Sequence, residues 1–297
     1  MSPPAVAVLG CGLIGSSWVE CFASAGATVR AWDPQTQTRE TLAARGLEAI
    51  EVCATPEAAV QGAEFIQESG PETLETKRSL LARIAPHVGP RSIFASSTST
   101  LQATQLQADS SIADRILIGH PFNPPHIIPL VEVVGGPATA PWAIDRAMAF
   151  YADMGKRPIR LRLERPGHLA NRLQAAVWRE AVDAVASGQA TVADVDAAVT
   201  FALGPRWAIM GPFATFHLGG GGGGLKHFIE HLGLPFEALW DDAHRPEMTP
   251  QLKRQLVDAV ANAVGNRPVQ DLSSERNVRL RHVMAAAHGP LKMTADE

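Results

Sequence analysis

Short apolar runs alternate with helical stretches through the first half of the chain. The apolar runs have the length and the flanking glycines of buried parallel strands, and they fall at residues 5–9, 28–32, 64–67, 92–95 and 115–119. Residues 16–26 and 71–85, which lie between these runs, are expected to be helices. Strands that alternate with helices predict right-handed βαβ units and a doubly wound α/β sheet.

Helical spacing dominates the second half of the chain. Residues 157–163 suit a last strand, and Pro166-Gly167 then marks a boundary. Helices are expected at residues 171–188, 191–201, 225–232 and 250–264, and the basic segment from Ser273 is partly amphipathic. Six consecutive glycines, residues 219–224, have apolar flanks and are interpreted as a tight loop that opens a helix. We therefore expect an α/β domain at residues 1–165 and an all-α domain at residues 166–297.

Composition narrows the possible classes of protein. The chain has 297 residues, of which 46% are hydrophobic and 19% charged, as in globular proteins with a core. The net charge of −4 creates no basic field for nucleic acid, and no apolar run reaches the roughly 18 residues of a membrane helix. The N-terminus lacks the features of a signal peptide, and Cys11, Cys21 and Cys53 lack metal or redox spacing. We expect a cytoplasmic protein with reduced thiols.

A glycine motif follows the first predicted strand. It reads Gly10-Cys11-Gly12-Leu13-Ile14-Gly15, it opens a helix, and Asp33 lies 18 residues beyond its last glycine. In a βαβ unit the first glycine permits a tight turn, the second lets backbone amides approach a pyrophosphate, and the third allows close packing. Asp33 would accept hydrogen bonds from a ribose and repel a 2′-phosphate, although Arg30 and Arg39 lie nearby. A Rossmann-type domain that binds NAD is therefore predicted.

Residues 119–134, GHPFNPPHIIPLVEVV, bring a histidine and an acid into apolar surroundings. His120 ends one apolar run and Glu132 lies inside another, while four prolines between them exclude a helix. Burying the Glu132 charge requires a partner, and a histidine paired with a carboxylate makes a general base or acid near neutral pH. The alternative is a surface histidine and a strand glutamate that faces water.

Three other groups of residues have two interpretations each. The hydroxyl cluster at residues 96–100 follows a strand, where it can bind a substrate oxygen or cap a helix. His227 and His231 have a spacing that can hold a metal, but no HExxH motif is present and we expect no metal site. The aromatic side chains of the second half suit a core or, alternatively, a cage around a cation, and they are Trp178, Trp207, Phe213 and Phe216.

Four motifs in this order resemble the 3-hydroxyacyl-CoA dehydrogenase superfamily over nearly the whole chain. They are GCGLIG with Asp33, FASSTSTL, GHPFNPPHIIPLVEVV and GHLANRL. The resemblance implies that His120 is the catalytic base or acid and that Glu132 orients it. It further implies that Ser96 and Asn171 contact the substrate oxygen, and that Glu72 and Lys77 belong to the cofactor site.

The chain departs from the acyl-CoA branch of that superfamily. It lacks the long helical excursion after the second strand, and no dense cluster of Lys and Arg is present there for CoA phosphates. It looks more like the branch that contains lambda-crystallin, L-gulonate 3-dehydrogenase and carnitine 3-dehydrogenase. The resemblance implies an NAD-dependent dehydrogenase that oxidises the 3-hydroxyl of a small free 3-hydroxy acid, such as carnitine or L-gulonate.

Two alternatives remain open at this point. One is an L-3-hydroxyacyl-CoA dehydrogenase, and the other is a non-catalytic protein that binds NAD or serves a structural role, as lambda-crystallin does. Because the helical second domain is apolar for its size, we also expect a homodimer.

Overall fold

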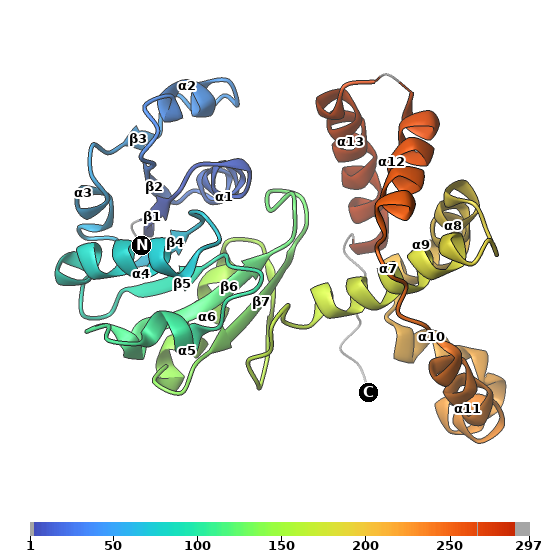
Figure 1. Cartoon of the computed structure of the whole chain (residues 1–297). Coiled ribbons are helices and arrows are strands. Elements are labelled where there is room, and N and C mark those ends of the chain that lie inside the picture. Colours follow the sequence, from blue (N-terminus) through green and yellow to red (C-terminus); the bar gives the residue numbers. More distant parts are fainter. Residues whose placement is uncertain (1–2, 266, 289–297) are drawn as a thin grey trace. The chain divides into compact units, whose positions relative to one another are not determined.

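The structure is a computed structural model that describes residues 3–265 and 267–288. The chain divides into two compact units, Met1–Arg172 and Leu173–Glu297. The first unit is an α/β domain and the second is helical (Figure 1). The fold class predicted from the sequence, a Rossmann-type doubly wound sheet followed by an all-α region, is confirmed.

One eight-stranded sheet forms the centre of the first unit, with the strand order β3-β2-β1-β4-β5-β6-β7-β8. Its neighbouring strands are parallel except for the antiparallel pair of β6 and β7. The strands are β1 Ala5–Leu9, β2 Thr28–Trp32, β3 Glu51–Val52, β4 Phe65–Glu68, β5 Ile93–Ser96, β6 Ile116–Pro121, β7 Leu130–Gly135 and β8 Arg157–Arg160.

Helices cover both faces of this sheet because the strand side chains alternate between two apolar cores. Val6 and Val8 of β1 face one core, whereas Ala7 and Leu9 face the other. The first core includes side chains of α1 Leu13–Ser24, α2 Thr38–Ala43 and α6 Pro141–Asp153. The second core includes side chains of α3 Pro56–Val60, α4 Leu74–Ile84 and α5 Ala103–Gln107 (Figure 1). Because β1, β4 and β5 are parallel neighbours, their carboxyl ends meet at one edge of the sheet.

Several short or weakly patterned elements of the first unit were not predicted from the sequence. Strand β3 has only two residues, and the short helices α2, α3 and α5 carry too few apolar positions to show a period. Helix α6 was also missed, although it begins with Pro141 at its first turn, which is a favoured position for proline. The predicted last strand at residues 157–163 is shorter in the structure, where β8 ends at Arg160.

The second unit consists of helices. They are α7 Ala170–Ala186, α8 Val192–Ala198, α9 Gly204–Ile209, α10 Pro212–Gly219, α11 Gly224–Asp242, α12 Pro250–Val264 and α13 Val269–His288. Residues 273–288 of the basic segment thus lie inside α13, and the rest of that segment lies outside the described residues. Helix α11 continues ten residues past the predicted end at Leu232.

The glycine run makes the turn between α10 and α11, which pack on each other (Figure 1). Gly224 has the left-handed φ of +61°, and a Cβ on Gly220 would lie 1.9 Å from the Gly224 oxygen. The run is therefore a tight turn, as the apolar flanks predicted.

Candidate functional site

The glycine motif forms the turn between β1 and α1. Gly10 has φ +89°, and a Cβ on it would lie 2.7 Å from the Gly70 nitrogen in the loop after β4. A Cβ on Gly15 would lie 1.7 Å from the Gly10 oxygen, so this position keeps α1 close to the turn. Gly12 is different, because a Cβ there would meet nothing within 4 Å.

This open space lies beside the first turn of α1, which begins with Leu13 and Ile14. The amides of a first helical turn have no partner within the helix and attract anions. The motif therefore fits a dinucleotide pyrophosphate, with each glycine serving the function that the sequence predicts for it.

A cleft of about 620 Å³ lies beside this turn and is lined by Gly10, Gly12, Trp32, Asp33, Gln35 and Arg83, among others. Half-buried Asp33 follows β2, and its two carboxylate oxygens accept hydrogen bonds from the amides of Cys11 at 2.6 Å and Gln35 at 2.8 Å. A carboxylate has about four lone-pair positions, so it can accept ribose hydroxyls as well.

Arg30 does not offset the Asp33 charge. Its guanidinium donates hydrogen bonds to the carbonyls of Ala58 and Gln61, at 3.1 and 2.6 Å. Asp33 therefore keeps the negative charge that disfavours a 2′-phosphate, which fits NAD.

His120 and Glu132 are direct neighbours across the antiparallel pair of β6 and β7. His120 Nδ1 lies 2.9 Å from Glu132 Oε2, and both side chains are buried. A carboxylate only accepts, so Nδ1 carries the proton and donates it to Glu132. In the neutral imidazole Nε2 then carries a lone pair that can accept a proton.

The second oxygen of Glu132 is held by the start of α7. Oε1 accepts hydrogen bonds from the amides of Leu169 at 2.9 Å and Ala170 at 2.8 Å. Burial raises the pKa of the Glu132 carboxyl, but the hydrogen bonds from His120 and from these two amides outweigh it, so the pKa is lower than usual. Glu132 is thus ionised near neutral pH, and its carboxylate fixes the tautomer of the His120 imidazole.

Asn171 follows these amides directly in α7 and is half-exposed. The short segment before it also brings His168 to the pair, because the His168 ring lies 5.0 Å from the His120 ring, centre to centre. The structure therefore pairs His120 with Glu132, places Asn171 one residue after the amides that bind Glu132, and adds a second histidine that the sequence did not single out.

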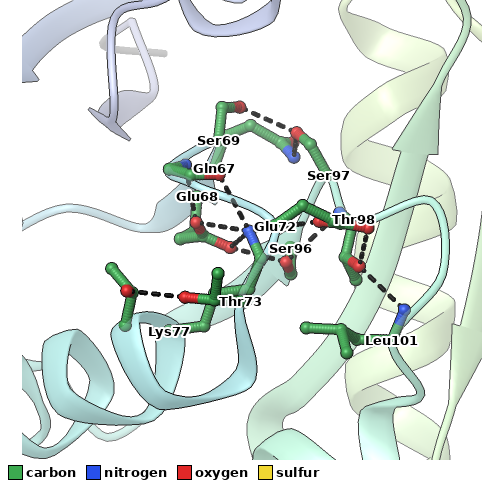
Figure 2. Close-up of polar contacts among 12 residues, drawn as sticks. Gln67, Glu68, Ser69, Glu72, Thr73, Lys77, Ser96, Ser97, Thr98 and Leu101 are labelled. Carbon is green, nitrogen blue, oxygen red and sulfur yellow. Dashed lines mark hydrogen bonds and ion pairs between the residues drawn. The ribbon is translucent and has the colours of Figure 1, made fainter.

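Ser96 lies in a different environment from the predicted one. It is completely buried at the end of β5, and its hydroxyl donates a 2.5 Å hydrogen bond to Glu68 Oε2 (Figure 2). Glu68, also completely buried, ends β4, the neighbouring strand. The difference arises because a buried carboxylate needs hydrogen-bond donors and Ser96 lies opposite Glu68 in the sheet.

Lys77 completes this cluster. Its ammonium lies 2.8 and 2.9 Å from the two Glu68 oxygens and 3.2 Å from the Gly70 carbonyl, and the side chain is 1% exposed (Figure 2). These acceptors use its three N–H donors. Lys77 lines the cleft, but its ammonium is bound by Glu68 and by the Gly70 carbonyl. The Gly70 backbone lies next to Gly10 of the glycine motif.

Glu72 holds the loop after β5. Its Oε1 accepts hydrogen bonds from the Thr98 hydroxyl at 2.6 Å, the Ser99 amide at 2.8 Å and the Thr100 amide at 2.9 Å. Burial raises the pKa of this carboxyl, but the hydrogen bonds from Thr98 and Thr100 and the charge of Lys77 outweigh it and lower the pKa. Glu72 therefore fixes the loop after β5, and of the two residues predicted for the cofactor site it is Lys77 that lines the cleft.

Sequence reasoning missed Glu68 and His168. Glu68 had a signal, because an acid that ends a buried strand must find a partner, and Lys77 one helix further on was the available cation. His168 gave no comparable signal, since a histidine after Pro166-Gly167 has the pattern of an ordinary turn.

Within the described ranges, no cluster of three or more His, Cys, Asp or Glu residues could hold a metal. The same ranges contain no helix with the length and apolarity to span a membrane.

A doubly wound sheet, a glycine cleft that fits NAD and a buried His–carboxylate pair define an NAD-dependent oxidoreductase. Comparison with known proteins agrees. Residues 5–46 and 35–164 match the model for the 3-hydroxyacyl-CoA dehydrogenase NAD-binding domain, and residues 167–263 match its C-terminal domain. The chain belongs to the 3-hydroxyacyl-CoA dehydrogenase family.

Named relatives and solved structures extend this finding. An L-carnitine dehydrogenase from Streptomyces griseus is 42% identical over 98% of this chain and 92% of its own. Another from Pseudomonas aeruginosa is 39% identical over 94% of this chain and 92% of its own. The structure of 5-formyl-3-hydroxy-2-methylpyridine 4-carboxylic acid 5-dehydrogenase, an NAD+-dependent dismutase, has a TM-score of 0.81 and 26% identity, and covers 96% of this chain and 98% of its own.

These comparisons confirm the superfamily resemblance and the branch seen in the sequence. They also confirm the prediction of an NAD-dependent enzyme that oxidises a small free 3-hydroxy acid.

Proposed function

We propose that this enzyme oxidises the 3-hydroxyl of L-carnitine to the 3-keto acid, with NAD as the hydride acceptor. The observation that carries the proposal is the buried His120–Glu132 pair, with Nδ1 of His120 committed to Glu132 and Nε2 left for a substrate. The choice of carnitine is supported by relatives of 38–42% identity that bear the name L-carnitine dehydrogenase.

In the proposed reaction His120 Nε2 removes the proton from the 3-hydroxyl. Glu132 stabilises the imidazolium that forms, because its carboxylate stays charged and its second oxygen is fixed by the amides at the start of α7. NAD, when bound at the glycine cleft, supplies the hydride-accepting ring. In reverse, the imidazolium returns the proton to the carbonyl oxygen.

Asn171 is the proposed second contact of the substrate oxygen, because its amide group follows the two backbone amides that hold Glu132. We leave Ser96 out of this contact, since its hydroxyl is donated to Glu68. The proposed cofactor contacts are the amides at Gly12, Leu13 and Ile14 for the pyrophosphate and Asp33 for the ribose.

The test of the substrate is NADH formation with L-carnitine, L-gulonate, 3-hydroxybutyrate and 3-hydroxybutyryl-CoA. We expect the highest kcat/KM with L-carnitine. A higher value with the CoA thioester would favour the acyl-CoA alternative. No turnover of any of the four, with NAD still bound, would favour a non-enzymatic role.

The test of the base is His120→Gln. It should lower kcat by about 10²–10⁴, because general base catalysis typically contributes that much. NAD affinity should be unchanged, as His120 does not line the glycine cleft. His87→Gln, a change of an exposed histidine, is the matched control. Near-native turnover in His120→Gln would exclude His120 as the base.

We also propose that the enzyme is a homodimer. In the described part of the second unit, only Val182, Val185 and Leu252 are buried apolar side chains. Three of the aromatic side chains that the sequence assigned to a core or, alternatively, to a cage are instead exposed, namely Phe213 at 79%, Trp178 at 59% and Trp207 at 41%. Exposed apolar surface of this kind favours a protein partner, and a second copy is the one always present. Light scattering after size exclusion should give about twice 31.6 kDa, and a mass of one chain would contradict the dimer.

A cytoplasmic location is part of the proposal. The three cysteines are free thiols, and burial raises the pKa of Cys11 to about 12, so this thiol stays protonated and unreactive. Cell fractionation should recover NADH-forming activity with the cytoplasmic markers, and recovery elsewhere would contradict it.

A further inference from the structure

His168 is strained and buried at the same time. It has a left-handed backbone with φ +49°, which non-glycine residues rarely adopt, and the residue is only 4% exposed. Its Nε2 lies 3.0 Å from the Thr98 carbonyl oxygen. A carbonyl only accepts, so Nε2 carries the proton and donates it to Thr98.

The other ring nitrogen of His168 has no such partner. Nδ1 is buried and forms no hydrogen bond with any described residue. In the neutral ring this atom is a lone pair, and a buried polar atom without a partner is uncommon in native proteins. Strained backbone tends to occur at functional sites. Both features fall on one residue beside His120, which indicates that the missing partner is a ligand of the active site.

Three rings lie in succession here. The His120 ring is 5.0 Å from that of His168 and 4.9 Å from that of half-exposed Phe122, centre to centre. Two carboxylates, Glu132 and Glu72, are also close enough to influence His168. Burial lowers the pKa of His168, and the hydrogen bond to Thr98 and the two carboxylates, which act in the opposite direction, do not offset it. The surroundings of His120 are therefore rich in π-electrons and negative charge, and His168 is neutral near pH 7.

The proposed substrate has two charged ends at equal distances from the reacting carbon. The trimethylammonium and the carboxylate are each two bonds from C3. When the 3-hydroxyl contacts His120 Nε2, a ring that flanks His120 is close to one of these ends. A lone pair and aromatic faces attract a quaternary ammonium and repel a carboxylate. These rings therefore suit the cationic end of the substrate better than its carboxylate.

We propose that His168 and Phe122 receive the quaternary ammonium group of the substrate and that His168 is a specificity-determining residue of this enzyme. The inference rests on the proposed oxidation of carnitine. It adds the residues that distinguish a cationic 3-hydroxy acid from an uncharged one of the same shape.

The experiment compares two ligands that cannot react. One, the charged ligand, is the deoxy analogue of carnitine, a trimethylammonium butanoate; the other is its tert-butyl isostere, which keeps the carboxylate but has no positive charge. Calorimetry with the NADH-loaded enzyme should show at least tenfold tighter binding of the charged ligand, in the range that desolvated cation–π contacts produce. His168→Leu and Phe122→Leu should each weaken the charged ligand about tenfold and leave the isostere within about twofold.

His168→Asn is the second variant, because asparagine tolerates the left-handed backbone and keeps a polar side chain. It should fold as the wild type does and lose part of the charge preference, so the test survives if His168→Leu does not fold. His87→Leu, at an exposed histidine, should change neither affinity.

The outcomes separate the two proposals. Equal weakening of both ligands in His168→Leu and His168→Asn, or no weakening of either, would overturn the role of His168 while carnitine oxidation by the wild type still stands. A wild type that neither oxidises carnitine nor prefers the charged ligand would overturn both proposals.

Discussion

Glu132 and Glu68 are two fully buried carboxylates in the same sheet, but their partners differ in kind. Glu68 is paired with the Lys77 ammonium and also accepts hydrogen bonds from Ser96 and the Gly70 amide. Glu132 is paired with the His120 imidazole and with two amides of the chain. Both charges are satisfied, so burial alone does not tell a structural carboxylate from a functional one.

The partner makes the distinction. Lys77 has all three donors engaged within the protein, so neither it nor Glu68 has a free position for a ligand. His120 uses one nitrogen for Glu132, which leaves its other nitrogen for proton transfer. We therefore interpret the Glu68–Lys77 pair as a support for the cofactor turn and the Glu132–His120 pair as the proposed reaction centre.

The largest expected effect belongs to Glu132→Gln. The amide can donate to Nδ1, which shifts the imidazole to the tautomer with a proton on Nε2 and removes the base. We expect kcat to fall by up to about 10⁴, the scale of the acid-to-amide change in a Ser-His-Asp triad. Stopped-flow measurement with saturating NAD tests this, and Glu64→Gln, at an exposed ion pair with Arg146, is the control. Loss of NAD binding instead of turnover would contradict our distinction between the pairs.

Lys77→Met should affect stability rather than chemistry. It leaves the Glu68 charge buried without its cation, which typically costs about 3–5 kcal/mol in free energy of unfolding. Urea unfolding measures this. Arg78→Met, which removes a largely exposed ion pair with Asp109, should cost at most about 1 kcal/mol.

The double variant Glu68→Gln with Lys77→Met should recover part of the lost stability, because no buried charge remains. A single Lys77→Met variant as stable as Arg78→Met would show that the pair contributes little to the fold.

The smallest effect is expected for Glu72→Gln. The folded-state pKa of Glu72 lies below its ordinary value of 4.5, so its contribution to stability is complete above pH 4.5 and is lost as the pH falls below 4.5 through the lowered pKa. The variant should therefore show a smaller fall in Tm over that acidic range. Calorimetric scans at several pH values measure this fall in Tm. The control is Glu75→Gln, at an exposed acid in the first turn of α4. An unchanged pH dependence would mean that the Glu72 hydrogen bonds do not persist in solution.

The sequence predicted the elements and pairs that depend on local pattern. Short continuous apolar runs and their flanking glycines located β1, β2, β4, β5 and β6 within about two residues, since a strand covered by helices on both faces must be apolar on both. The spacing in LVEVV made Glu132 a buried charge that needed a partner, and His120 was the nearest candidate. The turn was predictable at Gly10 and Gly15 because a Cβ at either position would clash with the backbone, whereas Gly12 has open space around it.

Tertiary structure decided which polar group serves which charge. Ser96 lies 28 residues from Glu68 in the sequence and meets it only because β4 and β5 are neighbours in the sheet, so a serine expected at the substrate donates to a carboxylate instead. His168 also depends on the tertiary structure, because only the fold places its unpartnered Nδ1 in a ring next to that of His120. Local pattern fixes whether a side chain is buried, because burial follows from periodicity, whereas the identity of its partner follows from long-range packing that no local window contains.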